Sequence, residues 1–187
     1  MKRGRSFFIR DTNIVAKELL GRVLVRVLPN GKKLKAIITE TEAYHGFDDE
    51  ASHASKKKTE RNKVMFEKGG LLYVYLVYGM YWCLNIVTME KDFPAAVLIR
   101  SMMVCPAVGD AHVRPLQIAG PGRVCKMLEI DKTFYGEDIT KSKRIWVEKG
   151  TNIKKRDIIA SKRVGVDYAE ECADWEWNYR VNLLEKK

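Results

Sequence analysis

The 187-residue sequence lacks paired cysteines, and it lacks an apolar leader behind its basic first residues. Four cysteines occur, and none forms a C-x-x-C pair, which argues against a zinc ribbon. A chain of this length can bury a sufficient core without disulfides, so we expect reduced thiols in an intracellular protein. Because no long apolar stretch follows residues 1–5, the sequence predicts no signal peptide.

Acidic residues are outnumbered: 24 Asp and Glu stand against 34 Lys and Arg, which leaves a net charge of +10. Such a surplus favours a polyanionic partner, either nucleic acid or an acidic membrane face. Basic residues are concentrated in residues 56–68 and 141–163, whereas residues 167–179 carry acids and no base. Charged runs are usually solvated faces, but two basic runs around an aromatic-rich centre favour a surface that follows a nucleic-acid strand.

Charge is absent altogether from residues 69–89, a stretch about as long as a membrane span. Its contents are unlike those of a membrane helix, because aromatic and β-branched residues recur at a spacing of two and Gly79 interrupts them. The stretch therefore predicts two buried strands joined by a tight connection, and we expect no membrane span.

The remaining pattern predicts helices alternating with strands, with no internal repeat and no linker long enough to separate domains. Asp11 is a suitable cap for the first helix, and Gly-Pro-Gly opens the last one. We therefore expect a single domain over residues 1–187. The predicted helices are residues 11–20, 59–68 and 121–130; the further strands are 23–28, 34–44, 95–104, 144–148 and 162–166, while residues 108–118 are only weakly patterned.

Two carboxylates on the strand at residues 34–44 are candidates for acid–base chemistry. Alternation places Glu40, Glu42 and Tyr44 on one face, and a carboxylate beside a buried aromatic ring is suited to act as a base. The competing interpretation is a solvent-facing strand with two surface acids. Periodicity alone does not choose between Glu40 and Glu42.

Residues 45–53 combine His, Asp, Glu and Ser side chains, but in no order typical of a metal-ligand motif. The sequence therefore predicts no metal. A paired-carboxylate glycoside hydrolase is a further alternative, and it lacks a clear second acid.

The tyrosines are clustered, with four of the eight between residues 73 and 81. Core packing is the ordinary explanation, but four phenolic hydroxyls are many to satisfy in a dry core. On strands, Tyr73 and Tyr75 share a face, and rings that open onto a pocket can stack on a base. Tyr78 at the bend is placed to wedge into a duplex.

Several motifs in order make the sequence recognisable. It resembles the alkyladenine (3-methyladenine) DNA glycosylase family from about residue 7 to residue 166, most specifically in the tyrosine-rich block. The motifs are Thr41-Glu42-Ala43-Tyr44, His53, Tyr73-Val74-Tyr75-Leu76-Val77-Tyr78-Gly79-Met80-Tyr81-Trp82-Cys83-Leu84-Asn85, Val97-Leu98-Ile99-Arg100 and Gly120-Pro121-Gly122-Arg123-Val124-Cys125.

The resemblance implies an α+β fold, a single compact mixed domain with a curved antiparallel β-sheet and a few surrounding helices, without a cofactor. It implies a base-excision-repair enzyme that flips a damaged purine, such as 3-methyladenine, another alkylpurine, hypoxanthine or ethenoadenine, out of double-stranded DNA. Its N-glycosidic bond would then be hydrolysed without AP lyase activity. We accordingly expect a monomer in the cytoplasm and nucleoid or in the nucleus.

Matching positions imply the roles of single residues. Glu42 matches the general base, and Arg100 matches an arginine that helps to hold the water and the backbone. Tyr44 matches one wall of the base pocket, and His53 and Tyr75 match the opposite wall. Two further matches are Asn85, which disfavours the guanine amino group, and Tyr78, which fills the gap in the duplex.

The sequence departs from the family where Glu60 replaces a usual proline, after a lysine-rich loop one residue short. Two alternatives stay open: a non-catalytic basic protein that recognises lesions in nucleic acid, and a degenerate glycosylase. The presence of Glu42 and Arg100 argues against the second.

Overall fold

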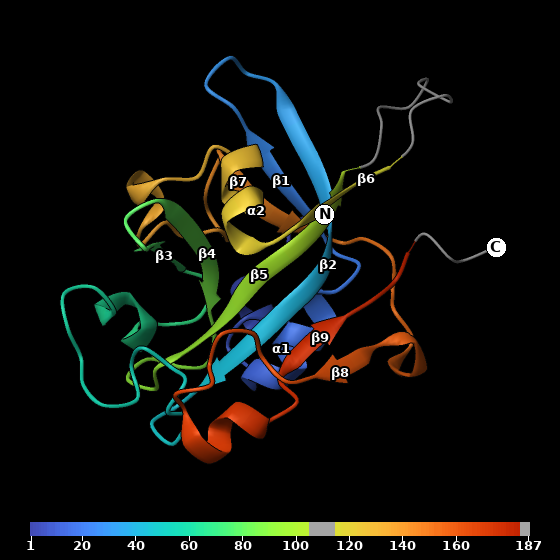
Figure 1. The fold of residues 1–187 in the computed structure, drawn as a ribbon. Helices are drawn as coiled ribbons and strands as arrows, with labels where there is room; N and C mark the ends of the chain where they lie inside the picture. Colours follow the sequence, from blue (N-terminus) through green and yellow to red (C-terminus); the bar gives the residue numbers. More distant parts are fainter. Residues whose placement is uncertain (105–114, 184–187) are drawn as a thin grey trace.

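The structure is a computed structural model that describes residues 1–104 and 115–183 (Figure 1). The helices are α1 (Thr12–Leu19) and α2 (Pro121–Met127), with five short 3-10 turns between other elements. The strands are β1 (Val23–Val27), β2 (Lys33–His45), β3 (Leu72–Val77), β4 (Tyr81–Val87), β5 (Ala95–Val104), β6 (Leu116–Ala119), β7 (Ile145–Glu148), β8 (Ile159–Ser161) and β9 (Asn178–Arg180).

All these strands belong to one antiparallel sheet, in the order β3-β4-β5-β2-β1-β7. The short strands extend this path, because β6 pairs with β5, β9 with β2, and β8 with β9. Figure 1 shows the sheet curling, so that the β3–β4 hairpin turns away from the plane of β1 and β2. The α+β class with a curved antiparallel sheet, implied by the family resemblance, is confirmed.

The helices cover the sheet where the hydrophobic pattern predicts. Asp11 caps α1 by accepting a hydrogen bond from the Ile14 amide, and Val15, Ala16 and Leu19 are buried in the core. The α2 helix packs against β4 and β5 and begins with Pro121, whose fixed φ suits a first helical position. No helix within the described ranges combines the length and apolar character needed to cross a membrane.

Three predicted elements need correction. The helix expected over residues 59–68 is only the 3-10 turn Lys63–Phe66, because Asn62 hydrogen bonds to the loop before it. The strand expected over residues 162–166 is an irregular connection after β8, and the helix expected to reach residue 130 ends at Met127. Most of the weakly patterned stretch 108–118 lies outside the described residues, and β6 begins near its end.

Candidate active site

A pocket of about 490 Å³ lies between the β3–β4 hairpin, β2, β5 and the connection after β8. Every residue to which the family resemblance assigns a role lines it, although these residues come from four strands, the loop after β2 and the β3–β4 turn. These residues are Glu42, Tyr44, His53, Tyr75, Tyr78, Asn85 and Arg100. Tertiary structure therefore brings the whole predicted set together.

Glu42 is fully buried on β2 and has a partner at each carboxylate oxygen. Oε1 accepts hydrogen bonds from the Val164 amide at 2.9 Å and from the Asn178 side chain at 3.0 Å. Oε2 accepts one from the Tyr44 hydroxyl at 3.0 Å and lies 3.5 Å from Arg100 Nη1. These contacts give both oxygens of the buried carboxylate a polar partner, as a buried polar group requires.

A double bulge between β2 and β5 places Arg100 beside both acids. The register advances from Glu40 opposite Ser101 to Thr41 opposite Ile99, so Arg100 and Ser101 together face Glu40. Such a bulge re-aims side chains, and here Arg100 Nε lies 3.4 Å from Glu40 while Ser101 donates to the same carboxylate. Glu40 thus has structural partners and does not line the pocket, unlike Glu42.

The Tyr44 ring forms one wall of the pocket and lies over the Arg163 guanidinium, 4.9 Å from its centre. Burial, followed by the negative charge of Glu42, raises the pKa of Tyr44 well above its usual value. The phenol therefore stays protonated, and its hydroxyl donates a hydrogen bond to Glu42.

His53 and Tyr75 both line the pocket and pack edge to face against each other, with ring centres 4.6 Å apart. His53 Nδ1 is 3.0 Å from the Tyr73 hydroxyl, within hydrogen-bond distance. Partial burial, followed by the Arg61 charge, lowers the pKa of His53 and favours the neutral ring.

Tyr78 stands at the tip of the β3–β4 hairpin with 88% of its surface exposed. Tyr78 and Gly79 have φ of 51° and 69°, and the Met80 amide donates to the Val77 carbonyl, as in the tight turns that suit right-twisted hairpins. The bend predicted for this tyrosine is confirmed, and the ring projects from the mouth of the pocket.

Asn85 is buried on β4, directly opposite Tyr73 on β3. Its side-chain amide donates to the Tyr73 carbonyl at 3.0 Å while the residue also lines the pocket. The side chain therefore satisfies a buried backbone group at the edge of the pocket.

The polar residues 45–53 have structural partners instead of forming a metal cluster. Asp49 accepts from the amides of His45 and Ala51, and His45 Nδ1 bonds to Thr12. Within the described part of the chain, no three His, Cys, Asp or Glu side chains converge as metal ligands would.

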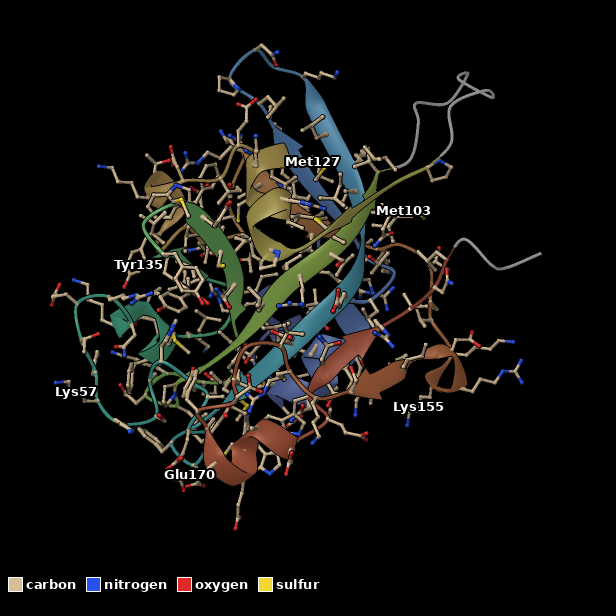
Figure 2. The ribbon with its side chains drawn as sticks, viewed as in Figure 1. Lys57, Met103, Met127, Tyr135, Lys155 and Glu170 are labelled. Carbon is tan, nitrogen blue, oxygen red and sulfur yellow. The ribbon has the colours of Figure 1, made fainter. Side chains whose placement is uncertain are left out.

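The two basic runs do not form one surface. Lys57 and Lys155 lie at opposite edges of the molecule in Figure 2, and Arg61 of the first run lines the pocket. Arg163 of the second run is buried in an ion pair with Asp49, which excludes it from phosphate contact. The expectation that the whole second run contacts phosphates is wrong at this residue.

Sequence reasoning missed the residues that support Glu42 from outside the recognised motifs. Val164 acts through its backbone amide, and Asn178 lies in a short strand near the end of the acidic stretch. Neither position carries a local signal, because a backbone donor has no side-chain signature and a lone asparagine is common in loops.

Comparison with known proteins agrees with this geometry. Residues 6–183 match the methylpurine-DNA glycosylase family. A relative from Clostridium novyi, named "Putative 3-methyladenine DNA glycosylase", is 41% identical over 97% of this chain and 96% of the relative. Relatives with the same name from Methanocella arvoryzae and Bdellovibrio bacteriovorus are 45% and 42% identical, over 94% and 91% of this chain and 90% of each relative.

The chain therefore belongs to the methylpurine-DNA glycosylase family. It is a DNA-repair enzyme, a DNA glycosylase for alkylated purines, and DNA is its substrate.

Proposed function

We propose that the enzyme turns a damaged purine nucleotide out of a DNA duplex and hydrolyses its N-glycosidic bond with a water molecule activated by Glu42. It would act as a monomer with one domain over residues 1–187, in the compartment that holds the cell's DNA. Its substrate would be 3-methyladenine, as the names of its relatives suggest. The observation that carries this proposal is a fully buried carboxylate that lines a pocket of about 490 Å³, a volume typical of small-molecule sites.

Base flipping is the step that the pocket requires, because C1′ of a stacked nucleotide is inaccessible inside a duplex. The cost of extrusion is a few kcal/mol and is smallest for damaged pairs. Tyr78, exposed at the hairpin tip, is placed to occupy the vacated stack.

Recognition of the flipped base would use the rings on the two walls, Tyr44 on one side and His53 with Tyr75 on the other. An N-alkylated purine is cationic, and electron-rich rings attract it by about 0.5–2 kcal/mol each. A neutral His53 adds no repelling charge. Asn85 would oppose the exocyclic amine of guanine, so that undamaged guanine binds poorly.

Hydrolysis would proceed by departure of the purine and attack of water at C1′. The C1′–N bond breaks with its electron pair going to the purine, a C1′–O bond forms, and Glu42 accepts a proton from the water. Among the described residues, Oε2 accepts a hydrogen bond from Tyr44 alone and stands near Arg100, so it is the oxygen suited to hold this water. The Glu42 charge also stabilises the developing oxocarbenium ion.

Strand cleavage by a lyase would need an amine that forms a Schiff base with C1′. Among the described residues that line the pocket, none is a lysine. This supports a monofunctional glycosylase that leaves an abasic site.

The decisive test is single-turnover excision of 3-methyladenine from a duplex by Glu42→Gln, with Glu40→Gln as the matched control two residues away. We expect Glu42→Gln to lose about 10²–10⁴ in rate and to retain lesion affinity within a few-fold. Glu40→Gln should lose far less. Near-normal excision by Glu42→Gln would refute the proposed mechanism, and lesion binding without excision by the wild-type protein would favour the non-catalytic alternative.

A further inference from the structure

We propose that Asn178 is a positioning residue for Glu42, because its side-chain amide ties the Glu40 and Glu42 carboxylates together and leaves one Glu42 oxygen for the water. This inference rests on the proposed function of Glu42 as the base. It assigns a role to β9, the short strand near the end of the described chain that pairs with β2 beside both acids.

The contact is direct and buried. Asn178 lies opposite Glu42 across the β2–β9 pairing, and only 2% of its surface is exposed. Its Nδ2 stands 2.9 Å from Glu40 Oε1 and 3.0 Å from Glu42 Oε1. A side-chain amide carries two hydrogens, so it can donate one to each carboxylate.

These bonds make the two oxygens of Glu42 unequal. Oε1 receives both the Asn178 hydrogen and the Val164 amide hydrogen, which satisfies its two lone pairs. Among the described residues, Oε2 accepts a hydrogen bond from the Tyr44 hydroxyl alone, with Arg100 Nη1 further away at 3.5 Å, so it retains acceptor capacity for a water molecule. Asn178 thereby decides which oxygen is free and holds the carboxylate in one rotamer.

The same amide reduces a conflict between the acids. Two carboxylates that share a site repel each other, and one of them then tends to take up a proton. Arg100 and Asn178 each contact both carboxylates, and Ser101 donates to Glu40. Removal of Asn178 would leave Arg100 as the one remaining group that bridges them among the described residues.

Several charged and titratable side chains surround Glu42. The charged and titratable side chains that face it are Glu40 and Tyr44 from β2, Cys83 from β4, Arg100 from β5, and Arg163 behind the Tyr44 ring. The Asn178 side chain does not ionise. Its replacement by alanine therefore alters the contacts of Glu42 without adding or removing an ionisable group, whereas its replacement by aspartate adds one.

The experiment measures single-turnover excision of 3-methyladenine from pH 5 to pH 9 by Asn178→Ala and Asn178→Asp. We expect Asn178→Ala to lose about tenfold in maximal rate, the equivalent of one hydrogen bond to a charged group. The acidic limb of its rate–pH profile should also shift to higher pH. Asn178→Asp keeps the side-chain shape but adds a third carboxylate, so the acidic limb of its profile should shift further. Adding Glu40→Gln to Asn178→Asp should move the limb back.

Tyr179→Phe is the matched control, because it removes the hydrogen bond from the neighbouring β9 residue to Asn13 and leaves the acids untouched. A melting curve and a lesion-affinity measurement accompany each variant. If folded Asn178→Ala and Asn178→Asp keep the wild-type pH profile, the inference is overturned even where Glu42→Gln is inactive. If Glu42→Gln stays active, the proposed function fails instead, whatever the Asn178 variants do.

Discussion

The Asp49 carboxylate and the Arg163 guanidinium face each other with both side chains fully buried, joined by hydrogen bonds of 2.6 Å and 2.8 Å. Arg163 also donates to the carbonyls of Ala43 and Cys172 and lies beneath the Tyr44 ring. The pair therefore joins the loop after β2 to the connection after β8, beside a ring that lines the pocket. The next residue, Val164, then donates its amide to Glu42.

Asp49→Asn should destabilise the protein strongly, because it leaves the Arg163 charge buried without its counter-ion. Loss of one partner of a buried pair typically costs about 3–5 kcal/mol of unfolding free energy. Denaturant titration measures this, with Lys162→Gln as the control that removes the exposed pair with Asp174. Equal free energies of unfolding for the two variants would show that the buried pair contributes no more to stability than the exposed pair.

Tyr78→Ala should weaken lesion retention for every substrate and leave the order of preference unchanged. The ring fills a gap that is the same whichever base is flipped. Relative affinities for duplexes with 3-methyladenine and hypoxanthine test this, and Leu116→Ala on β6 supplies an exposed apolar control outside the pocket. A change in preference at Tyr78 would place the ring against the base instead.

Asn85→Ser should raise relative activity on guanine-type bases, with some loss on adenine-type bases, because it shortens the amide that opposes the guanine amine. The bond from Asn85 to the Tyr73 carbonyl supports the competing interpretation, in which the residue only satisfies buried backbone. Excision rates on matched duplexes and a melting curve separate the two. Uniform losses with a lowered melting temperature would favour the backbone role.

Affinity for undamaged DNA should fall steeply with salt, and the lysines beside the pocket should account for much of the slope. Lys56, Lys57 and Lys58 changed together to Gln should reduce the slope of log K against log salt by up to about three, one unit per phosphate contact. Changing Lys154, Lys155 and Arg156 removes the same charge from the opposite edge of the molecule (Figure 2).

This second triple variant should change the slope much less. A flat salt dependence of the wild-type protein would refute the polyanion interpretation itself.

His53 should titrate below its usual pKa of 6.5, and Arg61→Gln should raise its midpoint by removing a neighbouring positive charge. Between the lowered pKa and 6.5 the unfolded chain binds more protons than the folded one, so folding stability rises with pH through that window. This contribution is complete above pH 6.5 and is lost as the pH falls.

NMR titration of the histidine ring protons measures the midpoint. Lesion affinity for a cationic purine should weaken in the wild type as the pH falls through the lowered pKa of His53, because the protonated ring would repel the base. His53→Gln should lack this pH dependence, and an unchanged midpoint in Arg61→Gln would contradict the electrostatic explanation.

Much of the fold follows from local chemistry in the sequence. The Asp11 cap, the Gly-Pro-Gly start of α2 and the alternation along β2 each act within a few residues, so the elements they predict are confirmed. The predictions failed where backbone groups hydrogen bond to side chains and not to the backbone of a helix or a neighbouring strand. Asn62 holds the loop that would have been a helix, and the Val164 amide donates to Glu42 where a strand was expected.

The family, the match of the pocket residues to its motifs and the two acids on one face of β2 can all be read from the amino-acid sequence. That Glu42 lines the pocket and Glu40 does not depends on the folded chain, because the bulge between β2 and β5 and the pairing with β9 arise from contacts between distant segments. Alternation places both acids on one face; the partners that surround each of them come from β5, β9 and the connection after β8.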